Sequence, residues 1–183
     1  MRILYVASQS PHGTGAHRLS AIRRLGHSAV PFGTETVADR GTRVTKWLRY
    51  RTLVGPAIRS FNHRLMDAVS AQHFDLVWFD KPVYVWPRTV QALRRTGALV
   101  VSYNPDNPYG PRRDPGWRLF LKSLPEFDIH LVPRQSNVTD YQNSGAARVL
   151  VMPFSFEPPL HFPPPDGWTD AERNFEVGFI GSP

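Results

Sequence analysis

The chain has 183 residues, of which 41% are hydrophobic, and its formal net charge is +7. This length is sufficient for one domain with a buried core, and the complete lack of cysteine excludes disulfides, cysteine-ligated metals and a cysteine nucleophile. No apolar run reaches the 18 residues typical of a membrane-spanning helix and no signal peptide is recognisable, so we expect a cytoplasmic protein.

Hydrophobic patterns predict strands that alternate with helices along the chain. We expect strands at residues 2–8, 28–32, 74–79, 98–103, 128–132 and 148–152, and helices at 16–25, 40–72, 89–96, 117–124 and 136–143. The long helical region is expected to break at Gly55-Pro56, and Ser136 is expected to cap the last helix. This alternation predicts an α/β fold: a Rossmann-like parallel sheet flanked by helices, with ligands bound beyond the carboxyl ends of the strands.

The composition changes near the C-terminus. Six prolines lie between residues 153 and 165, which favours an extended connector. Residues 175–183 then have the pattern of a new strand followed by a Gly-Ser turn, which is how a mononucleotide-binding βα unit begins. We therefore expect a Rossmann-like domain over residues 1–152, a linker over 153–174, and the start of a second domain at 175–183.

The loop after the first strand contains small residues that can approach a phosphate. It consists of His12, Gly13, Thr14 and Gly15. Glycine lets backbone N–H groups at a helix N-terminus reach an anion, so the loop is either a phosphate site or a flexible turn. A dinucleotide fingerprint needs a third glycine where this chain has Arg18, although Glu35 lies where a ribose-binding acid would be found. An NAD enzyme is therefore not favoured.

Polar side chains also follow the third and fifth strands. Asp80 and Lys81 end the third strand, where they can hold a sugar hydroxyl or a phosphate, or form a local ion pair. Arg134 follows the fifth strand and precedes a helix, a position that suits an anion but also an ordinary surface arginine.

The loop after the fourth strand is stiffened by prolines. Asn104, Asp106 and Asn107 lie between or beside Pro105 and Pro108. A carboxylate that is held rigidly at the ligand edge of a sheet can orient an acceptor hydroxyl or act as a general base, which makes Asp106 the candidate catalytic residue. The alternative is Asx-turn chemistry that only shapes the loop.

A basic segment extends from residue 40 to residue 64 without any acidic residue. Its apolar residues recur at helical spacing and form one predicted face: Trp47, Tyr50, Val54, Ile58, Phe61 and Leu65. This pattern indicates either a core-facing stripe with a solvated basic side or peripheral contact with an anionic membrane. The seven histidines show no metal-ligand spacing, and the positive charge comes without a nucleic-acid-binding motif, so neither a metal nor a nucleic acid is expected.

The order of these segments resembles that of a known enzyme family. The segments that carry the resemblance are residues 1–6, 25–30, 74–81, 103–107, 137–154 and 175–182. Together they look like the N-terminal domain of a glycosyltransferase with two Rossmann-like domains, the GT-B fold, and are similar to the CgeB-like (spore maturation) glycosyltransferases. The resemblance covers the whole chain, and it depends on order and spacing rather than on one diagnostic motif.

The resemblance implies a function and a division of roles. The chain would be the acceptor-binding half of a nucleotide-sugar-dependent glycosyltransferase that needs no metal, with the donor bound mainly by a C-terminal domain. Residues 12–15 would face the donor diphosphate. Asp80, Lys81, Asn104, Asn107 and Arg134 would face the sugar or small-molecule acceptor, next to Asp106. This half alone would turn over little substrate, because catalysis needs both halves in position. The alternative is a non-catalytic module that binds a sugar, a phosphate or a partner.

Overall fold

The computed structural model describes residues 1–11, 13–38, 41–111 and 114–158, together with residues 166, 167, 169 and 171. Within these residues, six parallel strands form one sheet in the order β2-β1-β3-β4-β5-β6. The strands are β1 (Arg2–Ala7), β2 (Ser28–Gly33), β3 (Leu76–Asp80), β4 (Leu99–Tyr103), β5 (Ile129–Val132) and β6 (Val149–Val151). The predicted α/β, Rossmann-like fold is confirmed.

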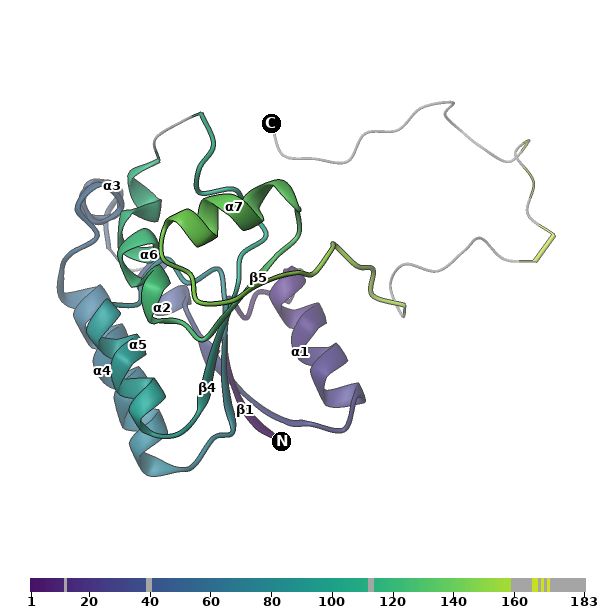
Figure 1. The fold of residues 1–183 in the computed structure, drawn as a ribbon, viewed down its shortest axis with the longest axis horizontal. Coiled ribbons are helices and arrows are strands. Elements are labelled where there is room, and N and C mark those ends of the chain that lie inside the picture. The colour runs from purple at the N-terminus through teal and green to yellow at the C-terminus, as the bar shows by residue number, and fades with distance from the viewer. Residues whose placement is uncertain are drawn as a thin grey trace.

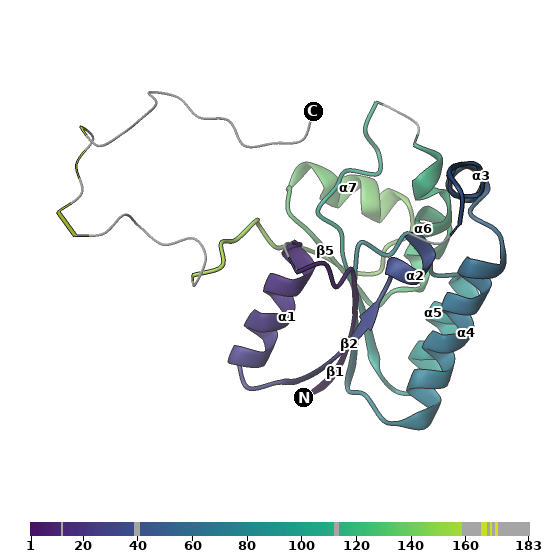
Figure 2. The same cartoon turned by 180° about the vertical axis from the view of Figure 1, so that it is seen from behind.

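Helices cover both faces of the sheet (Figures 1 and 2). They are α1 (Thr14–Arg24), α2 (Glu35–Ala38), α3 (Arg43–Thr52), α4 (Pro56–Ala71), α5 (Pro87–Arg95), α6 (Arg118–Ser123) and α7 (Ser136–Asn143), and the short 3₁₀ turns η1 (Pro115–Trp117) and η2 (Leu124–Glu126) flank α6. Helix α1 lies on one side of the sheet, and α4 and α5 lie on the other. This arrangement is expected when parallel strands are joined by right-handed crossovers.

The core consists of two hydrophobic layers, one on each side of the sheet. Successive residues of β1 enter opposite layers: Leu4 and Val6 pack with α4 and α5, whereas Ile3 and Tyr5 lie on the side of α1. The same alternation continues along β3 and β4. Because both faces are covered, the strands are almost continuously apolar, which is why the sequence pattern predicts them well.

Helices α3 and α4 are separate, as the Gly55-Pro56 pair predicts. Leu53 and Gly55 both adopt positive φ angles, 53° and 128°, and Pro56 occupies the first turn of α4. A proline at that position removes no helical hydrogen bond, whereas inside a continuous helix it would.

Two expectations about these helices are wrong. The predicted apolar face is not continuous: Ile58, Phe61 and Leu65 of α4 are buried, but Trp47, Tyr50 and Val54 are exposed. The chain bends at residues 53–55, and no residue of α3 is buried, so helical spacing does not carry across the bend (Figure 1). Ser136 is the first residue of α7 and not its cap, because Gln135 occupies the cap position and its side chain makes no capping bond.

Most of the C-terminal region in which we expect a linker and a second domain lies outside the described residues. Residues 153–157 continue from β6 without helix or strand, and Glu157 forms an ion pair with Arg24 of α1 at 2.5 Å. The remainder of the linker is described only at residues 158, 166, 167, 169 and 171, and the expected start of a second domain at 175–183 lies outside the described residues. The domain division therefore stays a prediction.

Candidate functional site

The strand order creates a crevice at one edge of the sheet. The chain leaves β1 toward β2 on one side, and β3 pairs with β1 on the other side. Loops from the carboxyl ends of β1 and β3 therefore diverge, and this switch point is where doubly wound sheets bind their ligands. A cavity of about 350 Å³ lies at this point.

The cavity is lined by residues from the ends of four strands. They are Ser8, Gly13, Thr14 and Gly15 after β1, Thr34 after β2, Asp80, Lys81, Val83 and Tyr84 at and after β3, and Pro105 and Asp106 after β4. The structure thus brings together six residues that the sequence indicated: Gly13, Thr14, Gly15, Asp80, Lys81 and Asp106. His12 lies outside the described residues.

The N-terminus of α1 forms one wall of this cavity. Gly13 is its cap residue and has no side chain to bond the first-turn N–H groups. A Cβ atom on Gly15 would lie 2.7 Å from the carbonyl oxygen of Ser8, so only glycine lets the helix approach β1 this closely. Uncapped N–H groups and the positive end of the helix dipole favour an anion at this place.

Asp80 is buried beneath the cavity in a charged network. Its Oδ2 accepts hydrogen bonds from the Tyr5 hydroxyl at 2.7 Å and from Arg18 Nε at 2.6 Å. The guanidinium of Arg18 also lies 4.5 Å from the centre of the Tyr103 ring, and it donates to Thr14 Oγ1 at 2.9 Å. Arg18 therefore ties α1 to the end of β3, in place of the glycine that a dinucleotide fingerprint would have.

Protonation in this network follows from its burial. Burial raises the pKa of Tyr5, and the Asp80 carboxylate raises it further, so Tyr5 stays protonated and donates its hydrogen. Burial alone would lower the pKa of Arg18, but its hydrogen bond to Asp80 and the carboxylate charge raise it overall. Arg18 therefore remains a cation beside the cavity.

Lys81 and Asp106 form an ion pair at the cavity. Lys81 Nζ lies 2.7 Å from Asp106 Oδ2, and the two side chains are 52% and 47% exposed. Lys81 has a positive φ angle of 56°, which is uncommon for a residue with a side chain and occurs often at functional sites. An ion pair this exposed adds little stability, so a ligand can replace it at small cost: the ammonium can bind an anion and the carboxylate a hydroxyl.

The other three predicted acceptor residues do not line the cavity. Asn104 is fully buried; its amide donates to Tyr141 and its Oδ1 accepts from the N–H of Asp106. No surface of Asn104 is left for an acceptor, so this residue shapes the loop. Asn107 likewise accepts from the N–H of Tyr109 and from Asn137 Nδ2. Arg134 is exposed beside the cavity, where it donates to the carbonyl of Pro105 at 3.2 Å.

Glu35 braces the loop after β1. Its Oε1 accepts hydrogen bonds from Ser8 Oγ at 2.9 Å and from the N–H of Gln9. The sequence indicates Glu35 as a possible ribose-binding acid, but its Oε1 is occupied by the hydrogen bonds from Ser8 and Gln9. The pattern also missed Ser8, Thr34, Val83 and Tyr84 as lining residues, because nothing in their spacing marks them before the strand order is known.

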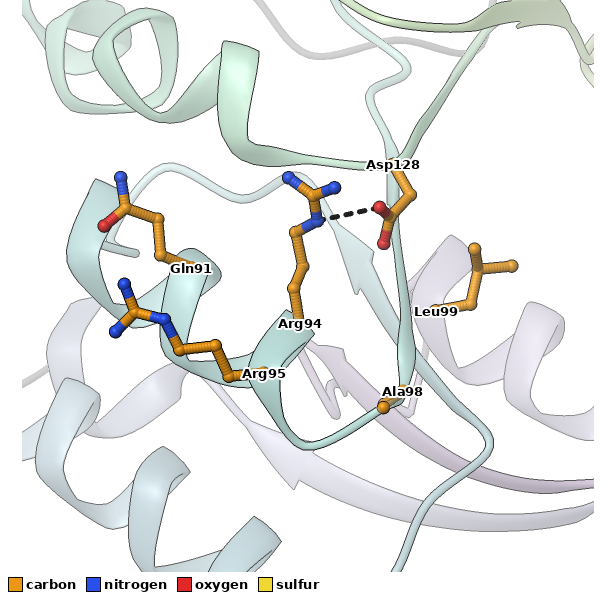
Figure 3. A pocket seen from close by; sticks show the side chains of 7 residues that line it. Gln91, Arg94, Arg95, Ala98, Leu99 and Asp128 are labelled. Atoms are coloured by element: carbon orange, nitrogen blue, oxygen red, sulfur yellow. Dashed lines mark ion pairs between the residues drawn. The ribbon is translucent and has the colours of Figure 1, made fainter.

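A larger hollow of about 580 Å³ lies at the opposite edge of the sheet (Figure 3). There, Arg94 points toward Asp128 and pairs with it at 2.8 Å. The second oxygen of Asp128 accepts from the N–H of Val100 at 2.8 Å. Asp128, just before β5, thus bonds to β4 through one oxygen and to α5 through the other. This edge is also the one that parallel sheets do not use for ligands.

Comparison with known proteins does not assign the chain to a family. No protein-family model matches the chain, and no curated protein matches it significantly. Within the described residues, no group of three or more metal-ligating side chains is present, and no helix has the length and apolar character needed to cross a bilayer.

Proposed function

We propose that this chain is the acceptor-binding half of a nucleotide-sugar-dependent glycosyltransferase of the GT-B type, similar to the CgeB-like enzymes. The observation that carries the proposal is the cavity at the switch point, where the anion-favouring end of α1 meets the Lys81–Asp106 pair. One wall favours phosphate and the other favours a hydroxyl, and a sugar transfer from a nucleotide donor needs both.

The dimensions of the cavity suit a small ligand. A volume of about 350 Å³ is at the lower end of the usual range for ligand sites, so it accommodates a monosaccharide or a phosphate group rather than a whole nucleotide-sugar. On this proposal the nucleotide lies outside the cavity, against a second domain, and only the reacting end of the donor enters. This division of the ligand agrees with an acceptor-side role.

Each charged group has a definite part in the proposed reaction. The N–H groups at the start of α1 stabilise the diphosphate as negative charge develops on it. Lys81, which the resemblance places on the acceptor side, is here assigned to the diphosphate as well, because its ammonium can bind an anion. Asp106 accepts a hydrogen bond from the attacking hydroxyl of the acceptor and takes its proton. Arg18 does not line the cavity; its ion pair with Asp80, which does line it, fixes the distance between α1 and the end of β3.

Binding measurements on matched variants test the proposal. Titration calorimetry with UDP-glucose, GDP-mannose and a panel of free monosaccharides should find a sugar that binds the wild-type chain. We expect Lys81→Met to weaken the nucleotide-sugar, and Asp106→Asn to weaken the sugar with nucleotide-sugar affinity kept. Lys122→Met and Asp67→Asn, which change exposed residues outside the cavity, serve as controls and should bind normally.

The outcomes separate this proposal from the alternative of a non-catalytic binding module. If transfer to an acceptor is detected by mass spectrometry, Asp106→Asn should lower turnover roughly a hundredfold or more, as expected for loss of a general base. Unchanged turnover would remove Asp106 from the mechanism. Binding of inorganic phosphate alone, with no contribution from a nucleotide or a sugar, would favour the binding module instead.

A further inference from the structure

Helix α3 has an unusual surface for a globular domain. None of its ten residues is buried, and three large apolar side chains project from it: Val44 is 71% exposed, Trp47 58% and Leu48 52%. Single exposed apolar residues are ordinary, but a group on one short helix marks a surface that contacts something else.

These side chains lie on one face of the helix. Trp47 and Leu48 follow Val44 by three and four residues, and Arg51 lies one helical turn beyond them. The guanidinium of Arg51 lies 5.4 Å from the centre of the Trp47 ring. Leu48 continues the face into a largely apolar groove of about 640 Å³ between α3 and α4, where Val54 and Ala57 also lie.

Among the described residues, the hydrogen bonds to α3 hold it in place and leave this face open. Tyr50 donates a hydrogen bond to Asp114, and Arg118 donates to the backbone carbonyl of Arg51. These bonds attach α3 to the start of η1 and to α6. Helix α3 therefore lies near the edge of the sheet at which the strands have their carboxyl ends (Figure 1).

The chain segment that contains α3 carries charge of one sign. Residues 41–66 contain no aspartate or glutamate, and α3 itself carries Arg43, Lys46, Arg49 and Arg51. A helix ridge with apolar tips and flanking cations matches the order of layers in a bilayer interface, where hydrocarbon lies below phosphate. Tryptophan and arginine are well suited to that boundary, since each combines an apolar body with a polar group.

We propose that α3 docks this protein onto an anionic membrane surface. Val44, Trp47 and Leu48 enter the boundary between headgroups and acyl chains, and Arg43 and Arg51 contact lipid phosphates. The docking is peripheral and reversible, because the apolar area of one short helix is small. This inference stands on a different surface from the proposed sugar-transfer site, so either can fail without the other.

Flotation with vesicles tests the docking directly. The chain should float with vesicles of phosphatidylcholine and phosphatidylglycerol in equal parts, and not with phosphatidylcholine alone. Arg43→Glu should lower the partition coefficient roughly thirtyfold, because it reverses one interfacial charge. A glutamate in the first turn of a helix favours the helix, so this loss would not come from unfolding. Trp47→Ala with Leu48→Ala should lower it at least roughly tenfold.

Controls on the other faces decide the interpretation. Arg95→Glu reverses an exposed charge on α5, and Leu25→Ala removes an exposed leucine at the end of α1; both should float like the wild type. Bound vesicles should also shift tryptophan emission to shorter wavelength in the wild type but not in Trp47→Phe. Failure to bind anionic vesicles would overturn the proposal. The proposal would also be overturned if Arg95→Glu weakened vesicle binding as much as Arg43→Glu does. It would likewise be overturned if an acidic protein bound the chain and vesicles did not.

Discussion

Three elements meet at one buried carboxylate. Asp80 at the end of β3 accepts hydrogen bonds from Tyr5 of β1 and Arg18 of α1, and only 7% of its side chain is exposed. A buried ion pair contributes modest net stability, but removal of one partner leaves a charge without compensation. The pair therefore fixes the geometry beside the cavity more than it adds to the free energy of unfolding.

A double-mutant cycle measures this coupling. Arg18→Met leaves the buried Asp80 carboxylate without its ion-pair partner and with the hydrogen bond from Tyr5, so it should lower the free energy of unfolding by about 3 kcal/mol. Asp80→Asn should cost less, about 1–2 kcal/mol, because Arg18 can still reach water. The double variant should be more stable than Arg18→Met alone. Urea unfolding measures all three, with the exposed Arg95→Met as a control; additivity within about 0.5 kcal/mol would contradict the coupling.

His130 links stability to acid at the residue scale. It is fully buried; its Nε2 donates to the carbonyl of Leu124 at 2.9 Å, and its Nδ1 accepts from Ser102 Oγ at 2.6 Å. Burial lowers the pKa of His130 to about 4 from its ordinary value of 6.5. The neutral imidazole is therefore part of the folded core.

Acid should destabilise the fold through this histidine. Between pH 6.5 and about pH 4, the unfolded chain binds a proton at His130 that the folded chain does not. The free energy of unfolding should thus fall by about 1.4 kcal/mol for each pH unit lost in that window. Urea unfolding at several pH values should show a shallower slope for His130→Gln, whose amide can replace both hydrogen bonds. Equal slopes would contradict the assignment, and NMR titration of the imidazole gives an independent check.

At the scale of elements, α4 positions the segment that follows β3. Asn62 is buried in α4; its Nδ2 donates to the carbonyl of Tyr84 at 2.9 Å and its Oδ1 accepts from the N–H of Trp86 at 2.9 Å. The backbone at Tyr84 and Trp86 is not part of a strand, so these bonds from Asn62 supply hydrogen-bond partners that a neighbouring strand would otherwise provide. Since Val83 and Tyr84 line the candidate site, α4 shapes one of its walls without touching a ligand.

Loss of this clamp should affect both stability and the cavity. Asn62→Ala removes both of these part-buried hydrogen bonds, so we expect the free energy of unfolding to fall by about 1–3 kcal/mol. Thermal unfolding measures the loss, and Asn143→Ala, an exposed position on α7, should be nearly neutral. A loss below about 0.5 kcal/mol would show that water replaces the asparagine.

The sequence predicts elements better than it predicts their exposure. Apolar runs mark β1 and β3 because both faces of each strand are buried, and Gly55-Pro56 marks the end of one helix and the start of another. The spacing of Trp47 and Ile58 is the same as it would be in one continuous helix, so it cannot show that only Ile58 is buried. That difference depends on the bend between α3 and α4 at Leu53 and Gly55, where φ becomes positive.

At the scale of the whole molecule, parallel strands explain why the candidate site was largely predictable. Carboxyl ends of parallel strands meet at one edge, so Gly13, Asp80, Lys81 and Asp106 had to lie near each other once the fold was known. The inward turn of Asn104 and the contact between Arg18 and Asp80 were not predictable, because they depend on which strands are neighbours and how the loops pack. Chemistry beyond this placement, including sugar transfer, stays a proposal.

The measurement that tests the central claim most directly is an NMR titration of ¹⁵N-labelled chain with UDP-glucose, because amide shifts detect weak binding and locate it. The switch-point site predicts that the largest shifts come from Gly13, Thr14 and Gly15 and from Lys81 and Asp106, and that Lys81→Met reduces them. Shifts confined to Arg94, Leu99 and Asp128 at the opposite edge, or no shifts at all at millimolar ligand, would contradict the assignment of this cavity as the ligand site.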